Sequence, residues 1–138
     1  MIHISTAHVL YDWHPLHLAK MGTTLDHMTG GQWGLNVVTG FHAHEMAMLG
    51  LESVPRDQRY FMAAEFTLML SIMQRSEENV TYDGAHWSLW DTYVSPKPLK
   101  GRPIIVSACS SEVGLDYACR YADLLFITGT GGAILPTS

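Results

Sequence analysis

The chain has 138 residues, of which 47% are hydrophobic and 15% are charged, and its formal net charge is −5. This length is enough for one globular core. The acidic balance gives no electrostatic support to a nucleic-acid or anionic-membrane partner, and no apolar run approaches the roughly 20 residues of a membrane span.

The start of the chain and its cysteines indicate the compartment. Residues 1–5 carry neither the charged segment nor the long apolar segment of a secretory signal peptide. Cys109 and Cys119 lie ten residues apart and do not form a disulfide framework. We therefore expect a cytoplasmic protein with reduced thiols.

The first third of the chain predicts a strand–helix–strand unit. Residues 2–9 alternate loosely and predict a strand, and Pro15 suits the first position of a helix. Apolar residues then recur at helical spacing until Gly30-Gly31 ends the helix. Residues 33–39 are apolar on both faces, which is typical of a strand in a parallel sheet.

The middle of the chain predicts an irregular excursion followed by a long helix. Residues 41–57 mix polarities, and we expect one helical turn near residues 44–49. Residues 59–75 are the strongest helix prediction. A helix that is apolar on two sides is deeply buried or packs against a partner subunit. Its two apolar stripes are Phe61, Ala64, Leu68 and Ile72, and Met62, Phe66, Met69 and Met73.

The last third predicts a β-hairpin and a second strand–helix–strand unit. Residues 80–94 are rich in Tyr, Trp and Thr, and Asp83-Gly84 is a turn signal. The pattern continues with an extended linker at residues 95–98, a strand at 104–108, a helix at 114–121, a strand at 124–128 and a flexible tail at 129–132.

These elements predict one α/β domain over residues 1–138, with about four parallel strands, intervening helices and a hairpin insertion. A TIM-type (β/α)8 barrel needs roughly 250 residues, so the chain would supply only part of one. A part of a barrel leaves two open sheet edges, which invite pairing with another chain. We expect a piece of a longer protein, or a chain that forms a homo-oligomer.

Polar groups beside two of the predicted strands are candidate site residues. Asn36 interrupts an apolar strand, so its amide must find either a structural partner or a ligand. Ser110 and Ser111 precede a helix, where hydroxyl and backbone N–H groups can bind an anion. The same serines could simply cap that helix.

A second group of candidates surrounds the start of the long helix. An Arg at a helix N-terminus opposes the helix dipole, so Arg59 suggests a phosphate contact or a pair with Glu45. A solvated helix start is the alternative for Arg59. Tyr60 belongs either to this site or to the core.

The histidines allow a different chemistry. His42 and His44 form an H-x-H pattern after a strand, as in some metal-dependent barrel hydrolases, although the further ligands that such a site needs are not evident. His14 also follows a strand and could face an active-site mouth, which makes it the catalytic candidate. Its alternative role is a polar helix start.

The segment from Gly34 to Gly40 reads GLNVVTG, and Glu45 and then Arg59-Tyr60 follow it. This order resembles the luciferase-like flavin-dependent monooxygenases, in particular the branch with pyrimidine, alkanesulfonate and dimethyl-sulfone monooxygenases. The resemblance runs along nearly the whole chain. It extends to His14-Pro15, Ala19-Lys20, Leu25-Asp26-His27, Tyr82-Asp83-Gly84, Trp87, Pro96-Lys97-Pro98, residues 110–114, Ala122-Asp123 and Phe126.

The resemblance implies that the chain holds strands 3 to 6 of a luciferase-like barrel, with two strands missing at each end. It also implies a two-component reaction, in which an NAD(P)H:flavin reductase supplies reduced FMN and O2 is used to oxygenate a small organic substrate. Ser111 and Arg59 would hold the phosphate, and Asn36 would touch the ring. The implied FMN contacts are Asn36, Glu45, Arg59, Tyr60, Ser110 and Ser111.

Two positions depart from the family pattern. Gln32 stands where Arg is common, and Cys109 stands where Gly is common.

Three hypotheses for the function remain open. They are a flavin monooxygenase or a piece of one, a metal-dependent hydrolase that uses His42 and His44, and a non-catalytic remnant of the flavin family.

Overall fold

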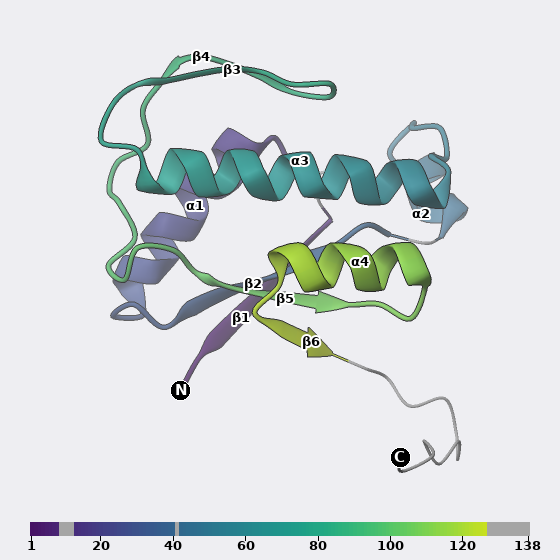
Figure 1. The fold of residues 1–138 in the computed structure, drawn as a ribbon, viewed down its shortest axis with the longest axis horizontal. Coiled ribbons are helices and arrows are strands. Elements are labelled where there is room, and N and C mark those ends of the chain that lie inside the picture. The colour runs from purple at the N-terminus through teal and green to yellow at the C-terminus, as the bar shows by residue number, and fades with distance from the viewer. Residues whose placement is uncertain (9–12, 41, 127–138) are drawn as a thin grey trace.

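The computed structural model describes residues 1–8, 13–40 and 42–126, and Figure 1 shows the arrangement of its elements. The predicted order of elements is confirmed within these residues. Among them, no helix combines the length and the apolar character that a membrane span requires. The elements are β1 (His3–His8), α1 (Pro15–Met28), β2 (Trp33–Val38), α2 (Ala43–Met48), α3 (Arg56–Arg75), β3 (Val80–Asp83), β4 (Ser88–Thr92), β5 (Ile104–Ala108), α4 (Glu112–Tyr121) and β6 (Leu124–Phe126).

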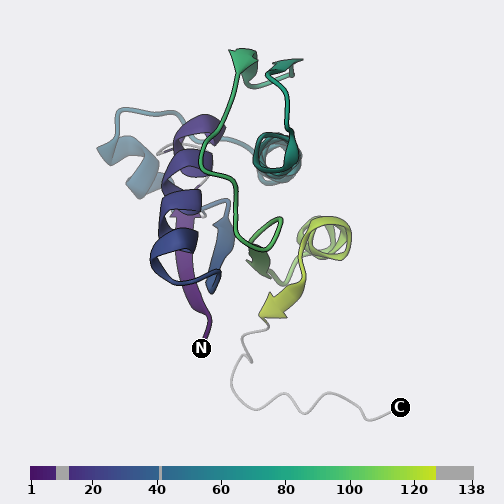
Figure 2. The same cartoon turned by 90° about the vertical axis from the view of Figure 1, so that its left-hand side faces the viewer.

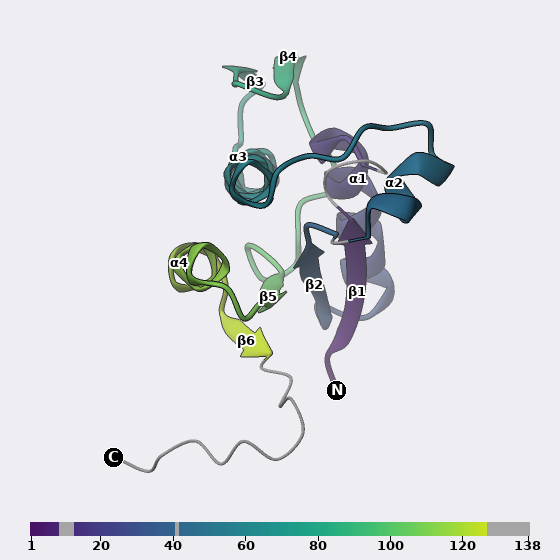
Figure 3. The same ribbon diagram turned by 90° about the vertical axis from the view of Figure 1, so that its right-hand side faces the viewer.

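Four strands form one parallel sheet in the order β1-β2-β5-β6, which confirms the predicted parallel α/β fold. Helices α1, α3 and α4 lie on one side of this sheet (Figures 2 and 3). Strand residues of one parity, Leu35, Val37 and Ile105, are buried in the core with these helices. Residues of the other parity, such as Asn36 and Val106, face away from the helices and are half-buried.

The close contact between α1 and β2 depends on a glycine. Gly22 lies on the inner side of α1, and a Cβ atom there would collide with the ring of Trp33. Leu18 and Ala19 of the same helix are fully buried beside it. The small residue therefore lets the helix lie close to the strand, where a larger one would push it outward.

Two helices begin earlier than the sequence predicts. Helix α3 begins at Arg56 instead of residue 59, because Pro55 fixes the extended backbone that precedes a helix and Asp57 complements the dipole of the first turn. Helix α4 begins at Glu112 instead of residue 114, because Ser111 caps it. The predicted strand residues 9, 127 and 128 and the tail at 129–132 lie outside the described residues.

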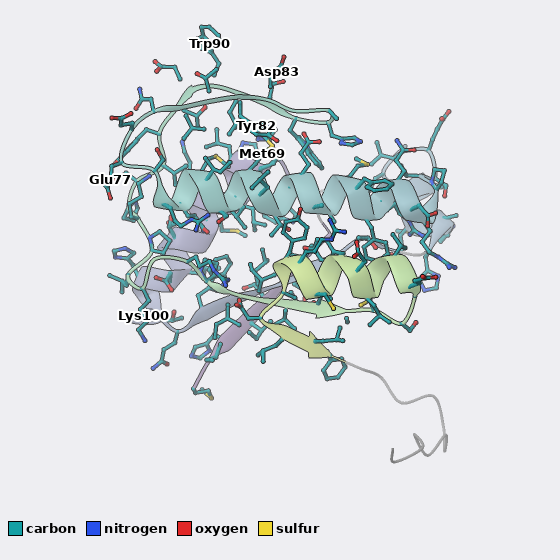
Figure 4. The ribbon with its side chains drawn as sticks, in the orientation of Figure 1. Met69, Glu77, Tyr82, Asp83, Trp90 and Lys100 are labelled. Carbon is teal, nitrogen blue, oxygen red and sulfur yellow. The ribbon has the colours of Figure 1, made fainter. Side chains whose placement is uncertain are left out.

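One of the two apolar stripes of α3 is buried. Phe66, Met69 and Met73 are in the core, whereas Phe61 of the other stripe is 68% exposed. The hairpin β3–β4 lies over this helix, as Figure 1 shows. In Figure 4, Tyr82 lies on the side of the hairpin that faces α3, and Trp90 points outward.

A carboxylate on α3 holds the hairpin. Oε1 of Glu65 accepts hydrogen bonds from the backbone N–H groups of His86 (3.0 Å) and Trp87 (3.1 Å), and Oε2 lies 2.7 Å from Nδ1 of His86. Burial alone would raise the pKa of Glu65, but the hydrogen bonds from His86 and Trp87 lower it. The turn is thus attached to α3 through an ionised side chain that is only 11% exposed.

Glu65→Ala should lower the free energy of unfolding by about 2 kcal/mol, because it leaves two backbone donors of the turn without their charged acceptor. Glu78→Ala removes an exposed carboxylate near the end of the same helix and should change it by less than about 0.5 kcal/mol. Urea denaturation followed by tryptophan fluorescence measures both values. Equal effects of the two substitutions would show that Glu65 does not hold the hairpin.

The N-terminus of α1 is capped by a histidine. Nδ1 of His14 accepts a hydrogen bond from the backbone N–H of Leu16 (3.1 Å), which requires that this nitrogen carry no proton. Burial, and then the charge of His17, lower the pKa of His14 below its ordinary value of 6.5. The folded chain therefore favours neutral His14.

Stability should consequently decrease as the pH falls from 7 to 5. The unfolded chain binds a proton at His14 at a higher pH than the folded chain does, so lowering the pH through this range favours unfolding. His14→Asn keeps a capping acceptor that does not titrate and should show a smaller decrease. Thermal unfolding of both proteins at several pH values measures the difference, and identical pH profiles would contradict it.

Candidate active site at the carboxyl edge of the sheet

A cleft of about 400 Å³ lies where β2 and β5 end and α3 begins. The carboxyl ends of neighbouring parallel strands are where α/β proteins place their ligands. We call it the carboxyl-edge cleft. Its lining residues are Val37, Val38, Thr39, Gly40, Arg56, Arg59, Tyr60, Ser107, Ala108, Cys109, Ser110 and Ser111. Four of the predicted site residues, Arg59, Tyr60, Ser110 and Ser111, thus lie together.

The serines of the cleft form the start of α4. Oγ of Ser111 accepts a hydrogen bond from the backbone N–H of Gly114 (3.2 Å), so Ser111 is the N-cap of the helix. The hydroxyl proton of Ser111 remains available to a ligand. The loop therefore combines a helix cap with hydroxyl donors at the positive end of a helix dipole.

Arg59 lines the same cleft as the serine loop and carries an unsatisfied donor. One terminal guanidinium nitrogen donates to the carbonyl oxygen of Gly40. Nε is buried and has no hydrogen-bond partner among the described residues. An orphaned buried donor is costly, so the guanidinium group would gain from a shift toward an oxyanion bound in the cleft that Arg59 lines. No ion pair joins Arg59 to Glu45 in the described part of the chain, and Glu45 is exposed on α2.

Tyr60 belongs both to the cleft and to the core. Its ring packs against that of Tyr117 at 5.9 Å between centroids, and the hydroxyl of Tyr117 lies 2.8 Å from Oγ1 of Thr67. Burial raises the pKa of Tyr117 far above its usual range, so this neighbour stays neutral. A Cβ atom at Gly114 would lie 2.7 Å from the hydroxyl of Tyr60, so the glycine allows α4 to approach this wall.

Two further lining residues bear on the chemistry of the cleft. Arg56, which no sequence motif indicates, adds a second cation because α3 begins three residues earlier than expected. Cys109 lines the cleft with a thiol whose pKa is raised by burial. A thiol with a raised pKa is a poor nucleophile at neutral pH, so Cys109 contributes to the shape of the cleft and not to its reactivity.

Three predicted site residues lie outside this lining. Asn36 is on the sheet face that points away from the helices, where Nδ2 donates to Oγ1 of Thr6 (3.4 Å) and Oδ1 is buried without a partner in the described part of the chain. Glu45 is on α2, and His14 caps α1.

The metal-site alternative lacks ligands in the described part of the chain. His42 and His44 are exposed at the start of α2. No three His, Cys, Asp or Glu side chains among the described residues converge on a point that could hold a metal ion. Among the described residues, His42 and His44 therefore have no third side chain beside them with which to hold a metal ion.

Solved structures share this fold. The riboflavin lyase RcaE, solved with modified FMN and riboflavin, has a TM-score of 0.83 and 24% identity over 92% of this chain and 33% of its own. DmoA from Hyphomicrobium sulfonivorans has a TM-score of 0.80 and 22% identity over 93% of this chain and 32% of its own. These likenesses confirm the predicted partial-barrel fold.

Curated relatives are more similar in sequence. The pyrimidine monooxygenase RutA of Acinetobacter baylyi is 32% identical over 121 residues, which are 85% of this chain and 32% of that protein. The FMNH2-dependent dimethylsulfone monooxygenase of Pseudomonas fluorescens is 33% identical over the same shares. The chain thus spans about a third of the length of these relatives. The family model described as luciferase-like monooxygenase matches residues 2–134, and the chain belongs to this family.

Proposed function

We propose that the protein is a two-component flavin-dependent monooxygenase, which uses reduced FMN and O2 to oxygenate a small organic substrate. In this proposal residues 1–138 are one domain that corresponds to strands 3 to 6 of the family barrel. The observation that carries the proposal is the buried Nε of Arg59, which has no partner among the described residues, in a cleft that is also lined by a helix N-terminus with two serines. The name of the FMNH2-dependent dimethylsulfone monooxygenase supports the same cofactor.

The donor set of the carboxyl-edge cleft fits a phosphate group. Two guanidinium groups, from Arg56 and Arg59, line the cleft together with the hydroxyls of Ser110 and Ser111. Guanidinium and hydroxyl donors at a helix N-terminus are the groups that bind phosphate oxygens in proteins. No carboxylate lines the cleft, so the lining presents no side-chain anion that would repel phosphate.

When bound, reduced FMN would supply the oxygen chemistry. The residues of this chain would bind and orient it. Arg59, Arg56 and the two serines would hold the phosphate, and Tyr60 would form an aromatic wall. Asn36 has an unsatisfied acceptor, Oδ1, which fits an N–H donor on the polar edge of the ring. For Glu45 and His14 the proposal rests on the family resemblance alone.

The proposal extends to partners and compartment. A separate NAD(P)H:flavin reductase would supply reduced FMN, and a small organic molecule, such as a heterocycle or a sulfur compound, would be the substrate. Free thiols at Cys109 and Cys119 are consistent with a cytoplasmic protein. Within the described residues β1 and β6 have no neighbour on their outer sides, and Phe126 is 60% exposed. Both features support association with further strands, in a homo-oligomer or a longer chain.

The phosphate assignment predicts a difference between two flavins. Arg59→Ala and Ser111→Ala should weaken the binding of reduced FMN by about tenfold or more, because each removes a donor to a charged acceptor. The same substitutions should weaken reduced riboflavin, which lacks the phosphate, by about threefold at most. Anaerobic titrations followed by flavin fluorescence measure both ligands.

Arg75→Ala is a matched control, because it removes an arginine of the same helix that does not line the cleft. It should leave the affinity for both flavins unchanged. Equal losses for FMN and riboflavin in Arg59→Ala and Ser111→Ala would refute the phosphate assignment. No binding of either flavin by a folded wild-type chain would mean that strands outside these residues are essential to the site.

A further inference from the structure

A second pocket, of about 230 Å³, lies between α3, α4 and the start of β5. Both helices end on this side of the molecule, so the pocket is at the end of the sheet opposite to the carboxyl-edge cleft (Figure 1). We call it the arginine pocket. Its lining residues are Thr67, Leu68, Leu70, Ser71, Gln74, Arg75, Arg102, Pro103, Ile105, Arg120 and Tyr121.

The inner wall of the arginine pocket holds an amide without a partner. Gln74 is only 2% exposed, and its Nε2 is buried without a hydrogen bond to any of the described residues. A buried amide nitrogen can only donate, so it requires an acceptor oxygen. Native proteins rarely keep such orphaned donors, and Gln74 lines the pocket, where a rotation of its terminal amide would bring Nε2 to an acceptor.

Three of the eight Lys and Arg residues of an acidic chain line this pocket. Arg102 is held by two hydrogen bonds to Asp123, of 2.6 and 2.5 Å. Nε of Arg120 donates a hydrogen bond to Asp116 (3.2 Å). Nε of Arg75 donates one to the carbonyl oxygen of Ser71 (3.3 Å). The terminal guanidinium nitrogens of Arg75 and Arg120 have no hydrogen bond among the described residues and remain available to an anion.

Apart from the hydroxyl groups of Thr67 and Ser71, the rest of the lining is apolar. Leu68, Leu70, Ile105 and the ring of Tyr121 form walls that a bare inorganic ion would not use. The volume is sufficient for an aromatic ring, since a cavity of about 150 Å³ already holds benzene. The lining therefore suits a molecule with an oxyanion at one end and an apolar body at the other.

The helix dipole accounts for only part of this arrangement. An arginine in the last turn of α3 or α4 interacts favourably with the carbonyl groups of the helix end, which explains Arg75 and Arg120. It does not explain why Gln74, in the penultimate position of α3, keeps a buried donor without an acceptor.

We propose that the arginine pocket binds a small organic carboxylate with an apolar body. The carboxylate accepts from Nε2 of Gln74 and from the guanidinium groups of Arg75 and Arg120, and the body lies against the apolar walls. This site is separate from the carboxyl-edge cleft and does not depend on the proposed flavin chemistry. The arginines of the pocket favour a carboxylate, and its apolar walls favour an apolar body on the same ligand.

Isothermal titration of the full 138-residue chain with sodium benzoate, at fixed ionic strength, tests the proposal. Benzoate should bind saturably at one site. Sodium sulfate, which lacks the apolar body, and benzyl alcohol, which lacks the charge, should bind about tenfold more weakly or worse. Arg120→Gln and Gln74→Met should each weaken benzoate by about fivefold or more. Lys20→Gln, on the exposed side of α1, is the matched control and should leave its affinity unchanged.

Gln74→Met also separates a ligand-binding role from a structural one. It removes a buried donor without a partner and keeps the length of the side chain, so the melting temperature should stay the same or rise while benzoate affinity falls. Several results would overturn the proposal. They are the absence of saturable benzoate binding, equal binding of sulfate, benzoate affinity that survives both substitutions, and affinity that is lost in Arg59→Gln but not in Arg120→Gln.

Discussion

The structure depends on one constraint, the alternation of side chains along β2 and β5. Leu35, Val37 and Ile105 point to the helices and are buried, so Asn36 and Val106 must point the other way. This parity fixes how α1, α3 and α4 lie on the sheet. The parallel direction of the strands makes the two ends of the sheet different, because all the carboxyl ends lie at one end and all the amino ends at the other.

The two pockets lie at opposite ends of the sheet, and α3, α4 and β5 border both of them. The N-termini of α3 and α4 surround the carboxyl-edge cleft, and their C-terminal parts line the arginine pocket. Arginines line both pockets, but in different electrostatic settings. At the N-termini the dipoles add to the charge of Arg56 and Arg59, whereas at the C-termini they partly offset Arg75 and Arg120. The first setting suits a doubly charged phosphate and the second a single carboxylate.

Local patterns were sufficient to predict most of the fold and part of the site. Apolar spacing and turn residues give the strands, α1 and the hairpin, and Ser111 and Arg59 follow from rules about helix starts. Arg56 was missed because the predicted helix began three residues late. Gln74 was missed because nothing in its neighbourhood along the chain shows that Arg102 and Arg120, both distant in sequence, lie on the same pocket. Contacts between distant elements set that pocket, and periodicity does not encode them.

Three buried polar atoms lack a hydrogen-bond partner among the described residues. Two of them are donors and one is an acceptor, and the donors lie on different parts of the fold from the acceptor. Nε of Arg59 and Nε2 of Gln74 are donors, and each lies on a residue that lines a pocket with other cationic groups. Oδ1 of Asn36 is an acceptor, and it lies on the sheet face away from the helices, where Thr6 satisfies only the other end of the amide. Each of these atoms costs stability while it stays unpaired. Anions bound in the two pockets would offer acceptors to the donors, and an N–H group at the open face of the sheet would offer a donor to Oδ1 of Asn36.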